Sequence, residues 1–125
     1  MSIFYGKGSW SSKVNFVDDN NILVGFDNED NCCARGGWFI SDKPDKWLHE
    51  TFKEEVLDMP GWNFDPDYFK EIEVPKDAYE GGAAQFRLVN GKKEKFLTLY
   101  NFHNGYYGRG FNMTIGGKEM RDGSV

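Results

Sequence analysis

The chain has 125 residues, a net charge of −5 and an aromatic content of 17%, with 11 Phe, 6 Tyr and 4 Trp. A chain of this length is ordinary for one domain and can bury a core without help from a metal or a disulfide. The aromatic content argues against disorder, and no apolar run approaches the ~20 residues of a membrane-spanning helix.

Charge, the first residues and the cysteines indicate the partner and the compartment. The negative charge argues against binding to nucleic-acid phosphates and is compatible with a protein partner that has a basic surface, but ordinary solubility is the better explanation of it. Residues 1–7 have neither the apolar segment nor the cleavage site of a secretory signal. Cys32 and Cys33 are neighbours, which rarely form a disulfide and fit a reducing compartment. We therefore predict a cytoplasmic protein with no cofactor, no metal and no membrane attachment.

In the first third of the chain, the pattern of apolar residues predicts strands. Residues 13–17 and 22–26 are separated by the turn-forming residues 18–21, so they read as a hairpin. Residues 37–40 form a short apolar run that predicts a further strand.

Residues 44–58 predict the one main helix. Pro44 suits a first helical turn, apolar residues including Phe52 and Val56 recur about every four positions, and Pro60 follows the end.

The second half of the chain carries the clearest strand signal. Residues 84–89 and 95–102 flank an Asn-Gly pair, which is the strongest short signal for a hairpin turn. Residues 106–115 follow a second Asn-Gly pair and read as the third strand of a meander, and residues 118–121 form a short final segment. Residues 62–74 fit either a helical turn at Pro66 or an edge strand.

Three Gly-Gly pairs, at residues 36–37, 81–82 and 116–117, read as turns. Together these elements predict an α+β fold in a single domain, residues 1–125. Its twisted antiparallel sheet combines the N-terminal hairpin with the C-terminal three-stranded meander, and the helix (about 44–58) packs on one face.

The cysteines and histidines are the residue types of two kinds of chemistry. Cys32, Cys33, His49 and His103 are the residue types of a zinc site, but their spacing does not match one, so we predict no metal. A Cys–His nucleophile pair, with Arg35 or His103 activating a thiolate, is the main enzymatic alternative. Because such partners meet only in the fold, the spacing neither supports nor excludes it.

The segment 102–111 is the strongest candidate for a binding surface. Tyr106, Tyr107 and Arg109 follow an Asn-Gly turn, and Tyr and Arg are enriched at binding hot spots. We group His103 and Arg35 with them as candidate binding residues. The competing interpretation is that the aromatics alternate into the core and that the glycines form a bulge.

Two short elements carry a resemblance to a known group. The first is Asp30-Asn31-Cys32-Cys33, which is one residue shorter than the group's Asp-x-x-Cys-Cys element. The second is the C-terminal Asn104-Gly105-Tyr106-Tyr107. In these two elements the chain resembles small uncharacterised bacterial and phage domains. The resemblance covers the two ends of the chain and not the predicted helix. It implies a microbial or viral origin, and it implies no activity.

The function that these observations favour is a non-enzymatic protein-binding module, such as a phage-encoded inhibitor or a toxin-immunity-type protein, that uses acidic and aromatic surface complementarity. The alternative is a small enzyme or small-ligand binder with a cleft formed by Cys32 or Cys33, His103 and the tyrosines. A third interpretation is an accessory protein that associates with itself through an exposed sheet edge.

Overall fold

The polypeptide folds into strands that pair in two sheets. The structure is a computed structural model that describes residues 1–5, 13–27, 34–44, 59–72, 80–103 and 110–125. In these residues the chain forms nine strands: β1 (Ser2–Tyr5), β2 (Lys13–Val17), β3 (Ile22–Asp27), β4 (Ala34–Ser41), β5 (Asn63–Ile72), β6 (Glu80–Asn90), β7 (Lys93–His103), β8 (Gly110–Ile115) and β9 (Lys118–Ser124).

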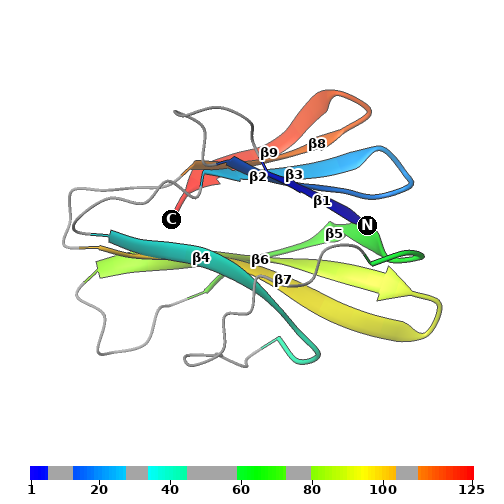
Figure 1. The fold of residues 1–125 in the computed structure, drawn as a ribbon, viewed down its shortest axis with the longest axis horizontal. Helices are drawn as coiled ribbons and strands as arrows, with labels where there is room; N and C mark the ends of the chain where they lie inside the picture. Colours follow the sequence, from blue (N-terminus) through cyan, green and yellow to red (C-terminus); the bar gives the residue numbers. More distant parts are fainter. Residues whose placement is uncertain (6–12, 28–33, 45–58, 73–79, 104–109) are drawn as a thin grey trace.

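The strands form two antiparallel sheets that lie face to face (Figure 1). Sheet A has five strands in the order β1-β2-β3-β8-β9, and sheet B has four in the order β4-β7-β6-β5. In sheet B the consecutive strands β5, β6 and β7 lie side by side and β4 adds next to β7, which is a Greek-key arrangement. The architecture is a β-sandwich.

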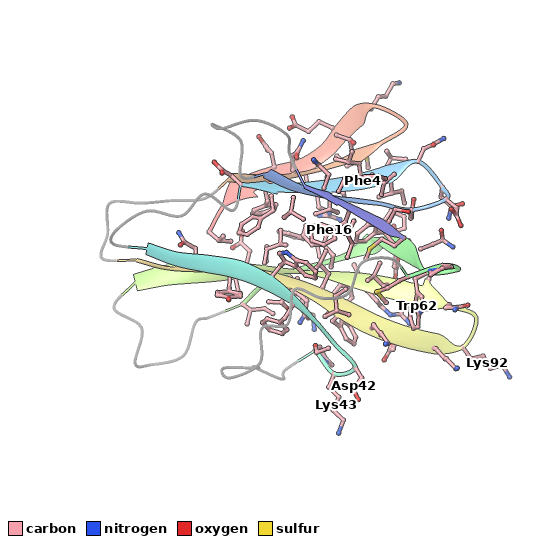
Figure 2. The ribbon with its side chains drawn as sticks, in the orientation of Figure 1. Phe4, Phe16, Asp42, Lys43, Trp62 and Lys92 are labelled. Carbon is pink, nitrogen blue, oxygen red and sulfur yellow. The ribbon has the colours of Figure 1, made fainter. Side chains whose placement is uncertain are left out.

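Aromatic rings from both sheets meet in the space between them. Phe16 of β2 and Trp38 of β4 pack edge to face with ring centroids 5.0 Å apart. Phe86 of β6 and Phe111 of β8 do the same at 6.1 Å. Figure 2 shows Phe16 between the two sheets. Such pairs contribute roughly 0.5–1.5 kcal/mol beyond the area that they bury, so they help to hold the sheets together.

Sheet B is buried on both of its faces along β6 and β7. The four consecutive residues 83–86 are all buried, and so are the six residues 96–101. Since successive residues of a strand point to opposite faces, a continuous buried run means that both faces are covered. Phe39, Ala83 and Tyr100 form a second, smaller apolar cluster on the face that points away from sheet A.

Asp18 connects the β2–β3 turn of sheet A to the start of β5 in sheet B. Its carboxylate accepts backbone N–H groups from Asn20 at 3.0 Å, Ile22 at 2.8 Å and Phe64 at 2.8 Å. The residue is only 6% exposed. A buried carboxylate is stable here because backbone donors replace the water that it has lost.

The predicted α+β fold is wrong. The described residues form two sheets and contain no helix, and all of the predicted helix 44–58 except Pro44 lies outside them. The prediction counted too few strands, because it missed β1 and left β5 undecided. A single sheet needs a helix to cover its apolar face, whereas here the second sheet covers it.

The N-terminal hairpin is confirmed as β2 paired with β3, and the hairpin at the first Asn-Gly pair is confirmed as β6 paired with β7. The predicted third strand of the meander is wrong in its partner. β8 pairs with β3 in sheet A and not with β7. The physical reason is that β7 already has β6 on one side and β4 on the other, so it has no free edge for β8.

Two of the three glycine pairs predicted as turns lie inside strands. Only residues 116–117 form a turn, with φ angles of 57° and 85° that favour glycine. Gly37 lies in β4 opposite Tyr100 of β7, and a Cβ at this position would lie 2.5 Å from Tyr100 Oη. The missing side chain therefore provides the space in which the Tyr100 ring packs.

The contact at Gly37 predicts a loss of stability in Gly37→Ala. The added methyl group meets the Tyr100 ring, so we expect the free energy of unfolding to fall by about 1–3 kcal/mol in urea denaturation. Gly110→Ala is the matched control, because a Cβ at this position would lie 3.9 Å from its nearest neighbour, the carbonyl oxygen of Gly123. It should change stability by less than about 0.5 kcal/mol. Equal losses in the two variants would contradict this account of Gly37.

The Asp18 carboxylate predicts a second loss of stability, in Asp18→Asn. The amide keeps the shape of the side chain but turns an N–H group toward backbone donors, so we expect a loss of roughly 1.5–3 kcal/mol in the free energy of unfolding. Asp19→Asn removes the same charge from the exposed neighbouring residue and should cost less than about 0.5 kcal/mol. The account fails if the two variants unfold at the same denaturant concentration.

Candidate functional site

Most residues of the predicted binding surface lie outside the described part of the chain. Tyr106, Tyr107 and Arg109 fall in residues 104–109, and Cys32 and Cys33 fall in residues 28–33. The binding surface built on the tyrosines and the alternative cleft built on the cysteines both stay predictions.

The backbone brings the two remaining candidates to the same end of sheet B. Arg35 of β4 lies opposite Phe102 of β7, and the next residue of β7, His103, lies opposite Ala34. His103 also lies opposite Glu80 of β6. The register therefore places Arg35 and His103 on neighbouring strands, one step apart along the sheet.

The described polar side chains of sheet B mostly bind one another. The buried Gln85 accepts a hydrogen bond from Tyr68 Oη at 2.8 Å and donates to the Pro44 carbonyl at 2.7 Å and to Thr98 Oγ1 at 3.2 Å. Trp38 Nε1 is the exception among the described residues, since it is buried without a hydrogen-bond partner. These hydrogen bonds stabilise sheet B and engage the polar groups of Gln85 in contacts within the fold.

Arg87 forms the main charged contact on the surface of sheet B. Its guanidinium lies 3.0 Å from Asp65 and 2.8 Å from Glu94. Hydrogen bonds to Asp65 and then to Glu94 raise the pKa of Arg87 above its ordinary value. Because both carboxylates pair with Arg87, we assign this cluster to the pairing of β5, β6 and β7.

The edge strands of the sandwich differ in how they are protected against pairing with another chain. Strand β9 carries Lys118, Glu119, Arg121 and Asp122 and has an irregular register against β8. Strand β5 contains Pro66 and shifts register between Asp65 and Phe69, so it is an edge strand with a bulge and not a helical turn. Charges, prolines and bulges are the usual devices that prevent edge-to-edge pairing.

Arg121 adds a further protection, because it ties these two edges together. It donates to the Pro66 carbonyl at 3.4 Å, and its guanidinium carbon lies 5.1 Å from the centre of the Phe69 ring. The other edge strand of sheet B, β4, carries one charged residue, Arg35, and pairs with β7 in a regular register.

Strand β1 has none of these protective features. Its sequence, Ser2-Ile3-Phe4-Tyr5, contains no charge and no proline, and its register against β2 is regular. Ile3 packs against the core, whereas Phe4 is 55% exposed on the outer face of sheet A (Figure 2). Met120 on β9, 58% exposed, is the other large apolar side chain exposed among the described residues.

The hydrogen bonds at the ends of β1 and β2 show which backbone groups of β1 point outward. Asp18 N–H donates to Ile22 O, so Asp18 faces β3 and its neighbour Val17 faces β1. Val17 lies opposite Ser2, so the backbone groups of Ser2 and Phe4 face β2, and those of Ile3 face away from β2.

An independent contact gives the same result. Met1 exchanges both backbone hydrogen bonds with Met59, at 2.6 and 2.8 Å. The backbone N–H and C=O groups of successive residues in a strand point to opposite sides. Those of Ile3 therefore point to the same side as those of Met1, toward Met59 and away from β2. The N–H and C=O of Ile3 have no partner among the described residues, and Phe4 lies beside them. We define Ser2, Ile3, Phe4 and Tyr5, with these outward groups, as the β1 edge.

Within the described residues, no group of three or more His, Cys, Asp and Glu could hold a metal ion. The same residues contain no helix long and apolar enough to cross a membrane.

No protein-family model, curated protein or solved structure matches the chain. The resemblance to small bacterial and phage domains therefore stays a prediction.

The β1 edge is not among the sites predicted from the sequence. A usable signal was present, since Ser2-Ile3-Phe4-Tyr5 is an uncharged run that contains three strand-forming residues. The sequence alone does not show that this run lies at the edge of a sheet, because the order of the strands depends on pairings between distant residues.

The direction of the backbone groups predicts a difference in hydrogen exchange between two neighbouring amides. In dilute solution the Ile3 amide, which has no partner within the described ranges, should exchange faster than the Phe4 amide, which faces β2. Amide exchange followed by NMR measures both rates in one sample. Slower exchange at Ile3 than at Phe4 would contradict the assignment of the β1 edge.

Proposed function

We propose that this chain is a non-enzymatic protein-binding module whose partner adds a strand to the β1 edge. The observation that carries the proposal is the backbone of Ile3, which has no partner among the described residues, beside the exposed ring of Phe4 on an edge without charges, prolines or bulges. An added strand forms backbone hydrogen bonds, which give affinity, and side chains beside it give specificity. Phe4 is the natural anchor, because aromatic residues dominate binding hot spots.

The chemistry of the β1 edge limits the kind of segment that it accepts. The edge carries no charge, so it offers nothing that selects a basic segment over a neutral one. A short extended segment with an apolar or aromatic side chain beside Phe4 fits it best. The basic partner predicted from the charge of −5 would have to contact other parts of the surface, and the inhibitor or immunity-type role stays a prediction.

Photocrosslinking from the β1 edge tests the proposal. A benzophenone amino acid replaces Phe4 in one version of the full chain and Met120 in another, and both are irradiated inside the cells that make the protein. We expect position 4 to give a discrete crosslinked protein band, identified by mass spectrometry, that position 120 does not give. Position 120 is a matched control because both side chains are exposed to nearly the same degree on opposite edges of sheet A. The absence of any band specific to position 4 would overturn the proposal.

A further inference from the structure

We infer that the segment that pairs with the β1 edge is the same strand of a second copy of this chain. This inference rests on the proposed function and names the partner. It requires that two β1 strands be complementary under a two-fold rotation, since an isologous interface uses the same surface twice.

Two copies of β1 fit when they run antiparallel with Phe4 on the two-fold axis. Ile3 of each copy then lies opposite Tyr5 of the other. Ile3 faces outward, and Tyr5, two residues further along, faces the same way, so each such pair can exchange both backbone hydrogen bonds. Phe4 lies opposite Phe4 of the second copy in a pair without backbone hydrogen bonds, where the side chains come closest.

A centre of symmetry at Ile3 is excluded by a contact already present. A two-fold axis at Ile3 would place Met1 opposite Tyr5 of the second copy. The outward groups of Met1 are already bonded to Met59. Pairing centred on Phe4 avoids Met1, so the β1–Met59 contact and the pairing of two copies are compatible.

Side-chain chemistry agrees with the backbone. Because Phe4 points to the outer face of sheet A, the pairing places two exposed aromatic rings side by side and shields both from water. No charged residue lies in β1, so no like charges face each other across the axis, although each chain carries −5. The result is one continuous sheet that runs through sheet A of both copies.

The size of the contact sets the expected affinity. Pairing along a strand of four residues buries less than the ~1,200 Å² of an ordinary specific interface, so we expect a weak, concentration-dependent dimer. Because the two copies carry like net charges, added salt should not dissociate the dimer, whereas it weakens a complex between an acidic and a basic protein.

Sedimentation equilibrium of the purified chain, at concentrations up to about 1 mM, tests the inference. We expect a monomer–dimer equilibrium that survives added salt. Phe4→Lys should weaken it by about tenfold or more, because an aromatic pair is lost and two ammonium groups face each other. Met120→Lys makes the same change in charge on β9 and should leave the equilibrium unchanged. A monomer at every concentration, or equal effects of the two variants, would overturn the inference.

Disulfide trapping gives a second readout that does not depend on how well Phe4→Lys folds. In a background with Cys32→Ser and Cys33→Ser, Phe4→Cys should form a covalent dimer under mild oxidation, since the Cβ atoms of facing residues come within about 5 Å. Met120→Cys should not. Failure of Phe4→Cys to link would count against the two-fold pairing.

The two proposals fail in different ways. If benzophenone at position 4 crosslinks a different protein and the purified chain is monomeric, the β1 edge binds proteins but the partner is not a second copy. If position 4 crosslinks nothing and the chain is monomeric, both proposals are wrong.

Discussion

The face-to-face packing of two twisted sheets is the constraint on which the rest of this structure depends. Each sheet hides the apolar face of the other, with Phe16 against Trp38 and Phe86 against Phe111 at the contact. Burial of this kind favours folding by about 25 cal/mol for each Å² of apolar surface removed from water. A sandwich nevertheless remains open at its sides, because only a closed barrel removes every edge.

The edge strands of the sandwich differ in their protection against pairing with another chain, and this difference supports a binding role for β1. Arg121 joins β9 to β5, and charges, a bulge and a proline discourage further pairing along both strands. On β1 the outward groups of Met1 are bonded to Met59, whereas those of Ile3 have no partner among the described residues. In water such groups are hydrated at little cost, so the open edge need not destabilise the isolated chain. Binding at the β1 edge becomes favourable when the added strand forms backbone hydrogen bonds and also places an apolar side chain beside Phe4.

Some of the fold could be predicted from the sequence, because alternation and turn chemistry are local. The β2–β3 and β6–β7 hairpins follow from a short polar turn and from an Asn-Gly pair, respectively. The glycine pairs inside β4 and β6 were misread as turns. Gly37 is there because Tyr100 on the neighbouring strand needs the space, and no local pattern records that contact.

The rest could not be predicted, because it depends on distant pairings. The placement of β8 beside β3 follows from the occupied sides of β7, which only the complete sheet order reveals. The same holds for Phe4, whose exposure is a consequence of β1 lying last in sheet A. Of the candidate residues chosen from the sequence, the structure relates only Arg35 and His103, through the backbone register at one end of sheet B.

The central claim, that β1 pairs with itself about Phe4, is tested most directly by isotope-filtered NMR on a mixture of labelled and unlabelled chain. In an antiparallel pair without backbone hydrogen bonds the Cα atoms are about 4.5 Å apart, and the α-protons point toward each other. The account predicts an intermolecular contact between the Phe4 α-protons of two copies. A concentrated sample that shows no such contact, or shows one centred on another strand, would contradict it.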